Sequence, residues 1–299
     1  MKNMYSFFDR ATKKMNQEPV YGLGFLSFAY THPFGKVLLE YLFSRKPLNQ
    51  LYGIYKRSRF SQAKIEKDIE EYGIDLNEFR EQKYRNYSDF FLRKFKDGRR
   101  AFSSDLNELG AFAEGKYLAF ASIDEGTRFP VKGQVLNLER LFGDQTQWSE
   151  RFRGGSAWIC RLCPIDYHWF HFPCSGKIID QYAISGRYHS VSMYALSHRS
   201  ETLFTNERQI NILDTGANGL IALIEVGALC VGKIKSVHER NRPFAKGEIK
   251  GYFDFGASTV IVLTEKGKWQ PDPDLIAQTV RQVETQVRLG DSIGRVHSL

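Results

Sequence analysis

Hydrophobic positions follow two different rhythms along this chain. In the first part they recur every three or four residues: Ile65, Ile69 and Tyr72 share one face of a helix that Ser61 can cap. From about Ala111 onward, short apolar runs alternate with glycine, aspartate and proline, which is typical of many strands. The pattern therefore predicts an α+β fold, with an N-terminal helical region packed on a mostly antiparallel β domain.

The change of rhythm also predicts the domain organisation. We assign residues 1–105 to a helical region and residues 106–299 to a β-rich domain. A chain of 299 residues is long enough for one large domain or two small ones.

Two apolar segments, residues 21–30 and 37–43, stand out in the helical region, and Arg45 and Lys46 follow the second. Apolar segments closed by basic residues suit helices at an anionic membrane surface, because apolar contact and attraction to headgroups act together. Helices buried in the protein core use the same residues, so both interpretations stay open.

The composition narrows the classes of partner. The formal net charge is +8, which suits an anionic membrane surface or an acidic ligand, and no nucleic-acid-binding motif is apparent. Four cysteines are too few for a disulfide scaffold and favour a reducing compartment. The first residues lack the layout of a signal peptide, and no apolar run reaches the roughly 20 residues that span a bilayer.

One serine has a sequence context that suggests chemistry. Gly256 and Ala257 leave the backbone room to bend just before Ser258, and residues 260–263 read as a buried strand. A hydroxyl at a strained turn can attack the carbonyl group of the residue before it. In isolation, however, small residues before a serine usually form only a turn.

Two histidines, His168 and His171, lie in an aromatic segment that also resembles a metal site. With Cys160, Cys163 and Cys174 they form a dense set of possible zinc ligands. However, no turn residue separates the first two cysteines, and positions three apart on an extended strand face opposite sides. We therefore predict no metal site; a packed aromatic strand with incidental histidines is a further alternative.

Together these stretches resemble the phosphatidylserine decarboxylases, pyruvoyl enzymes that make their own prosthetic group. The family's Asp-Tyr-His-x-x-His-x-Pro segment matches residues 166–173 closely. Its Gly-Ser-Thr cleavage motif matches residues 257–259, with Ala257 in place of the glycine. Its Pro-x-Asp-Gly-x-Val segment matches residues 112–117, with Glu114 in place of the aspartate. The resemblance covers nearly the whole chain. It implies that residues 1–105 provide membrane association and substrate access and that residues 106–299 form the catalytic domain.

The resemblance implies a role for each candidate residue. Ser258 attacks the Ala257 carbonyl, His171 is the base, and Glu114 is the carboxylate that supports it. Cleavage between these two residues converts Ser258 into a covalent pyruvoyl group, and the two resulting chains stay associated. The pyruvoyl group forms a Schiff base with the substrate amine, and His168 reprotonates the α-carbon after carbon dioxide leaves.

The activity implied by this resemblance is decarboxylation of phosphatidylserine to phosphatidylethanolamine. The resemblance further implies peripheral binding at the cytoplasmic side of the cell membrane, and it is compatible with a homodimer. The changes at Glu114 and Ala257 leave open a lipid-binding protein that has lost self-processing. A pyruvoyl decarboxylase of another amino-acid-like substrate is the remaining alternative, although the apolar N-terminal segments favour a lipid.

Overall fold

The computed structural model describes residues 4–124, 136–229, 234–254, 256 and 258–297. Ala257, on one side of the predicted cleavage, and Cys230 lie outside these residues. Within the described part of the chain, no helix has both the length and the apolar character needed to cross a membrane.

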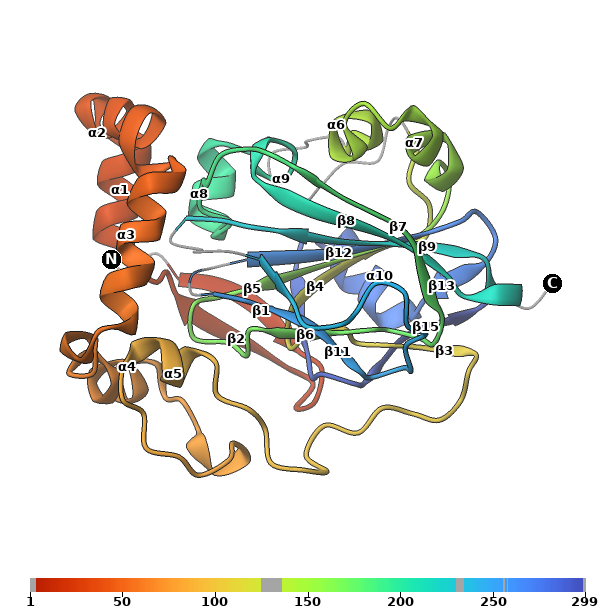
Figure 1. The fold of residues 1–299 in the computed structure, drawn as a ribbon, viewed down its shortest axis with the longest axis horizontal. Helices are drawn as coiled ribbons and strands as arrows, with labels where there is room; N and C mark the ends of the chain where they lie inside the picture. The colour runs from red at the N-terminus through yellow and green to blue at the C-terminus, as the bar shows by residue number, and fades with distance from the viewer. Residues whose placement is uncertain (1–3, 125–135, 230–233, 255, 257, 298–299) are drawn as a thin grey trace.

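A nine-stranded sheet forms the centre of the molecule (Figure 1). Its order is β2-β1-β14-β4-β5-β12-β9-β8-β7, and all neighbours are antiparallel except β1 and β14. The strands are Met4–Asp9 (β1), Lys14–Pro19 (β2), Gly115–Phe120 (β4), Ala157–Leu162 (β5), Lys177–Ile184 (β7), Arg208–Asp214 (β8), Leu220–Val226 (β9), Ser258–Thr264 (β12) and Glu284–Val287 (β14). With the helices described below, this sheet confirms the predicted α+β class.

Two three-stranded sheets, β10-β11-β6 and β13-β15-β3, complete the β structure. Their strands are Glu108–Gly110 (β3), Trp169–His171 (β6), Ile234–Ser236 (β10), Ile249–Phe253 (β11), Trp269–Pro271 (β13) and Ser292–Val296 (β15). The first of these sheets matters for the site, because the Phe253 amide donates a hydrogen bond to the His168 carbonyl at 3.1 Å. This contact brings the histidine segment beside the chain that leads to Ser258.

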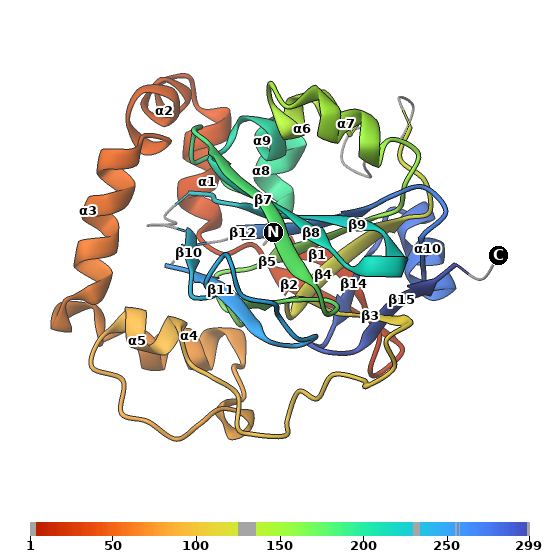
Figure 2. The same cartoon turned by 45° about the vertical axis from the view of Figure 1, so that its right-hand side comes forward.

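Strand β12 lies at the centre of the core. All seven of its residues are buried, and its β-branched Val260, Ile261 and Val262 suit a pleated surface that is covered on both faces. Figure 2 shows α6, α7 and α9 above the large sheet and β11 below it. The helices of this region are Leu138–Phe142 (α6), Thr146–Phe152 (α7), Met193–His198 (α8), Thr202–Thr205 (α9) and Pro273–Val280 (α10).

The hairpin of β1 and β2 was absent from the prediction, which treated the first hundred residues as mainly helical. It runs from the pair Met4 and Pro19 to the pair Asp9 and Lys14, and β1 then adds to β14 in parallel. An isolated two-stranded hairpin is only marginally stable in water. Docking on β14, from the far end of the chain, therefore stabilises this hairpin.

The remaining N-terminal elements are helices along one side of the sheet (Figures 1 and 2). They are Leu23–Thr31 (α1), Pro33–Leu38 (α2), a π-helical turn Leu39–Phe43, Lys46–Arg57 (α3), Lys64–Tyr72 (α4) and Tyr87–Phe91 (α5). Helix α1 buries Leu26, Ala29 and Tyr30, while Phe25 and Phe28 are exposed. The segment therefore packs on the protein with one face and leaves the other apolar face open.

Ser61 does not cap α4, contrary to the prediction. The Ser61 hydroxyl donates to the carbonyl groups of Lys56 and Ser58, and α4 begins three residues later at Lys64. A short 3₁₀ turn, Arg59–Ser61, ends at the predicted cap, and residues 62–63 form a turn where the prediction has the start of the helix. Tertiary contact explains the shift, since the Ser61 hydroxyl also accepts from the Tyr87 amide at 2.9 Å.

Candidate active site

Ser258 is the first residue of β12, and its side chain is buried. The strand register places it opposite Leu162, the last residue of β5. Two residues earlier, Gly256 has a φ of 113°, a conformation that glycine adopts readily and other residues rarely. The glycine before the predicted cleavage position is therefore required by the backbone conformation there.

His168 faces the Ser258 hydroxyl. The His168 Nδ1 atom lies 3.4 Å from the Ser258 Oγ, and the His168 Nε2 atom lies 2.8 Å from the Cys163 carbonyl oxygen. Because a carbonyl oxygen only accepts hydrogen bonds, Nε2 carries the proton and Nδ1 presents its lone pair to the hydroxyl. The Phe91 ring stacks on the imidazole, with 3.9 Å between ring centroids.

The environment keeps this imidazole neutral. Burial lowers the pKa of His168 to about 3, and the nearby Arg93 guanidinium lowers it further, while the bond to the Cys163 carbonyl opposes the shift. At neutral pH the side chain is therefore an uncharged hydrogen-bond acceptor for Ser258. This is the protonation state that a general base requires before it takes a proton.

His171, at the end of β6, has different partners. Its Nδ1 atom donates to the Gly247 carbonyl oxygen at 2.8 Å, and its Nε2 atom lies 3.4 Å from the Tyr167 hydroxyl. The Phe102 ring stacks on it, and burial lowers the pKa of His171 to about 4. His171 is thus also neutral.

Glu114 precedes β4 and binds an arginine. The Arg100 guanidinium donates to both of its carboxylate oxygens, at 2.5 and 2.8 Å, and the Leu289 amide donates to Oε2 at 3.0 Å. Its charge also contributes, after burial, to a raised pKa of Tyr167, the residue whose hydroxyl faces His171. The Tyr167 hydroxyl thus contacts His171, and the Glu114 charge acts on the same hydroxyl.

The structure therefore brings only one of the two histidines to Ser258. Among the hydrogen bonds of the described residues, neither His171 with Ser258 nor His171 with Glu114 is present. The geometry follows from spacing, because side chains three positions apart on an extended segment face opposite sides. The chemical roles implied by the resemblance stay predictions.

The turn before His168 contributes groups that the sequence analysis did not assign. Asp166 accepts a hydrogen bond from the Cys163 amide at 2.8 Å and forms an ion pair with the buried Lys116 at 3.3 Å. Arg93 donates to the Ile165 carbonyl at 2.6 Å. These bonds fix the turn and hence the carbonyl that sets the His168 tautomer. The sequence signal was Asp166 itself, two residues before the histidine.

The zinc alternative finds no support in the described part of the chain, where no group of three or more potential ligand side chains is placed to hold a metal ion. Cys160 is buried on β5, and the Cys163 sulfur instead lies 2.9 Å from an Arg161 nitrogen. Burial raises the pKa of the Cys163 thiol to about 12.

A mainly apolar pocket of about 490 Å³ reaches the approach to Ser258. Helical-region residues and β-domain residues share its lining, so it lies between the two parts of the molecule. The lining residues are Tyr21, Gly22, Phe25, Leu26, Phe43, Leu48, Asn49, Tyr52, Lys64, Pro164, Ser190, Leu229 and Gly256. Of these residues, Lys64 alone carries a charge.

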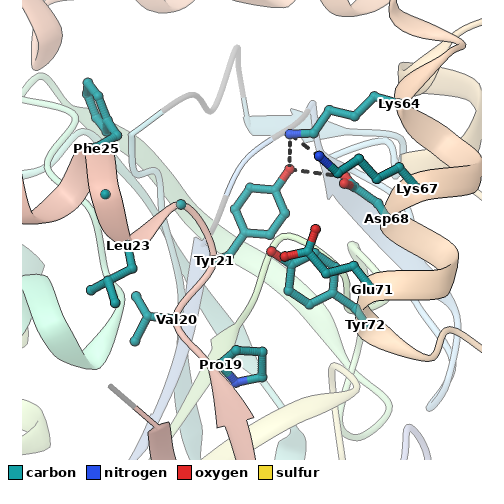
Figure 3. Close-up of a pocket in the computed structure, with 12 residues that line it drawn as sticks. Pro19, Val20, Tyr21, Leu23, Phe25, Lys64, Lys67, Asp68, Glu71 and Tyr72 are labelled. Carbon is teal, nitrogen blue, oxygen red and sulfur yellow. Dashed lines mark hydrogen bonds and ion pairs between the residues drawn. The ribbon is translucent and has the colours of Figure 1, made fainter. Parts of the chain in front are cut away.

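An adjoining, more polar pocket of about 360 Å³ shares Tyr21, Gly22, Phe25 and Lys64 with the first (Figure 3). Figure 3 shows the Lys64 ammonium group at the Tyr21 hydroxyl, to which it donates at 2.7 Å, with Asp68 beside them. The Tyr21 hydroxyl donates to Asp68 at 3.2 Å. The cation at the boundary of the two pockets is therefore held in place by α4.

A buried serine at the start of β12 faces a buried histidine, and an apolar pocket reaches the residue two positions before that serine. A model of the family described as phosphatidylserine decarboxylase matches residues 87–295. This chain is 38% identical over 290 residues to the phosphatidylserine decarboxylase proenzyme of Fusobacterium nucleatum, covering 96% of each chain. It is 36% identical to the proenzyme of that name from Clostridium perfringens, covering 97% of this chain and 99% of the relative. The chain belongs to the phosphatidylserine decarboxylase family, as its sequence predicted.

Proposed function

We propose that this chain is a self-processing decarboxylase that converts phosphatidylserine to phosphatidylethanolamine and carbon dioxide. Family membership over nearly the whole chain supports the reaction. The observation that carries the proposal is the Ser258 hydroxyl facing His168 at the edge of an apolar pocket. The name proenzyme, borne by the relatives, supports a maturation step by cleavage.

Maturation begins with the Ser258 hydroxyl. Its oxygen attacks the carbonyl carbon of Ala257 while a base takes its proton, and the peptide bond becomes an ester. β-Elimination then breaks the Ser258 Cβ–Oγ bond, so Ala257 leaves with a new carboxylate and residue 258 becomes dehydroalanine. Addition of water releases ammonia and leaves a pyruvoyl group.

Two histidines compete for the role of base in this step. The family resemblance assigns it to His171, with Glu114 as its carboxylate, and we retain that assignment as a proposal. The Tyr167 hydroxyl faces His171 and its pKa responds to the Glu114 charge, which supports a connection between the two groups. His168 has the direct contact with the hydroxyl, so its removal is the decisive comparison.

The surroundings of Ser258 fit a pyruvoyl group. Residue 258 follows Gly256, which lines the pocket, and His168 lies against the atom that leaves during maturation. When formed, the group supplies an electron sink for the charge released as carbon dioxide leaves the substrate. We propose that His168, after its Nδ1 has taken up a proton from the substrate amine, delivers that proton to the carbon that loses the carboxylate, since Nδ1 is the atom that faces this position.

The pocket and the outer helix faces support a lipid substrate. Apolar side chains line the way to Gly256, and Lys64 offers a positive charge to an anionic headgroup. Large apolar residues are exposed on α1 to α3 and just after them: Phe25, Phe28, Phe34, Val37, Tyr41, Leu42, Leu51, Ile54, Tyr55 and Phe60. We propose that this surface binds the cytoplasmic side of the cell membrane peripherally, with the net positive charge assisting.

Intact-mass spectrometry of the purified protein tests the proposal. We expect two fragments, residues 1–257 and 258–299, with a pyruvoyl group at the start of the shorter one. An unmodified serine at that position would indicate ordinary proteolysis. A chain that stays whole after long incubation with lipid would instead support a lipid-binding protein without self-processing.

A further inference from the structure

An ion pair connects the end of α3 to the chain just before the cleavage position. The Arg57 guanidinium lies 2.7 Å from the Asp254 carboxylate. Arg57 is the last residue of α3, and Asp254 is the first residue after β11. The contact therefore joins the helical region to the connector between β11 and β12, which carries Gly256 and ends at Ser258.

One described residue of the connector lies beside a cavity. Gly256 borders the 490 Å³ pocket, so the backbone at this position has open space on one side. Its φ of 113° is a conformation open to glycine, the residue type with the widest backbone freedom. A side-chain contact at Asp254 restrains the segment at the point where the strand ladder of β11 has ended.

Helix α3, which carries Arg57, is held in place by contacts near both of its ends. At its start, Lys46 forms an ion pair with Glu207 at 3.0 Å. Near its end, the buried Lys56 ammonium group lies 3.8 Å from the centroid of the Tyr87 ring. A cation in the last turn, such as Arg57, also interacts favourably with the helix dipole.

We propose that Arg57 is a positioning residue for self-cleavage: through Asp254 it holds the connector so that Ser258 meets the carbonyl group before it. This inference rests on the proposed self-processing. A solvent-accessible ion pair contributes little to global stability. Attack within a chain depends far more steeply on geometry, and a displacement of about 1 Å can cost a hundredfold in rate.

The test follows cleavage of the full chain after cell-free synthesis, with samples resolved over time by denaturing electrophoresis. We expect Arg57→Ala and Asp254→Asn each to slow cleavage by about tenfold, with unchanged melting temperature. The double variant should be no slower than either single one, because both remove the same contact. Arg57→Lys should retain most of the rate, and high salt should slow the wild type more than Arg57→Ala.

Lys46→Ala is the matched control, because it breaks an ion pair at the other end of the same helix. The two pairs are similarly exposed, at 48% and 14% for Arg57 and Asp254 and 51% and 21% for Lys46 and Glu207. We expect the wild-type rate for Lys46→Ala. If the wild type cleaves and Arg57→Ala cleaves at the same rate as this control, the inference is wrong and the proposed function is unaffected. A wild type that never cleaves overturns the proposed function and the inference with it.

Discussion

The helical region and the central sheet distribute apolar and charged side chains in opposite ways. On the helical side, Phe34 is 60% exposed and Phe60 is 76% exposed. Below the sheet, Lys250 of β11 forms an ion pair at 3.1 Å with Glu225 of the central strand β9, and both side chains are fully buried. The helical region therefore exposes large apolar side chains, whereas the β domain buries a pair of opposite charges.

This difference indicates that the two regions are stabilised for different surroundings. An apolar surface of this extent on a folded protein marks a contact with a partner or a lipid phase. A buried ion pair, by contrast, adds little net stability, but removal of one partner strongly destabilises the protein. We therefore propose that the helical surface serves association, whereas the β domain keeps a fixed arrangement around Ser258.

The largest expected effect is that of Ser258→Ala, which removes the reacting atom without touching either surface. We expect one intact chain with no decarboxylase activity, by electrophoresis and by carbon dioxide release. Thr264→Val is the matched control, because it removes another buried hydroxyl group from β12. Cleavage of Ser258→Ala would show that another residue provides the nucleophile.

The histidine variants divide the chemistry of the sheet into two steps. We expect His171→Ala to remain uncleaved and His168→Ala to mature but release carbon dioxide about 10²- to 10⁴-fold more slowly, since each loses an acid–base group. Electrophoresis measures the first effect and carbon dioxide release the second. His198→Ala, on α8, is the control. Should His168→Ala stay intact while His171→Ala matures, the 3.4 Å contact with Ser258 carries the cleavage proton and the roles are reversed.

The buried ion pair tests the sheet side of the comparison. In a Ser258→Ala background, which we expect to remain one chain, Glu225→Gln should lower the free energy of unfolding by about 3–5 kcal/mol, because it leaves Lys250 charged and unpaired. Urea denaturation measures the loss. Combining Glu225→Leu with Lys250→Met should recover much of it.

Arg80→Ala is the control for that measurement, because its ion pair with Asp97 lies at the surface, where such pairs contribute about 0–1 kcal/mol. If Glu225→Gln and Arg80→Ala lowered the free energy of unfolding equally, the buried ion pair would contribute no more to stability than the surface pair, and the comparison would be wrong.

The apolar helix surface tests the other side of the comparison. Phe34→Glu combined with Tyr41→Glu should lower binding to anionic vesicles by at least about tenfold, since burial of one large apolar side chain contributes about 1.5–3 kcal/mol. Vesicle flotation measures this effect, and high salt should weaken wild-type binding. Val280→Glu, an equally exposed apolar position on α10, should float like the wild type. If both variants lost vesicle binding to a similar extent, the helices would have no specific role in membrane binding.

The sequence by itself determined the fold class, the family and the central strand. The β-branched and aliphatic run was sufficient to predict the strand at residues 260–263, because local composition and burial agree there. The segment around His168 and His171 and the serine after two small residues identified the family, since each of these two motifs is a short continuous stretch of sequence.

Tertiary structure decided how those residues face one another. The β1–β2 hairpin depends on pairing with β14, and the Arg57–Asp254 contact joins residues nearly two hundred positions apart, so neither has a local signal. The same spacing rule that argued against zinc also separates the two histidines, but only the position of β12 shows that His168 is the one turned toward Ser258. Sequence spacing determines that His168 and His171 face opposite sides of the segment. Long-range packing determines which of those two sides faces the Ser258 hydroxyl group.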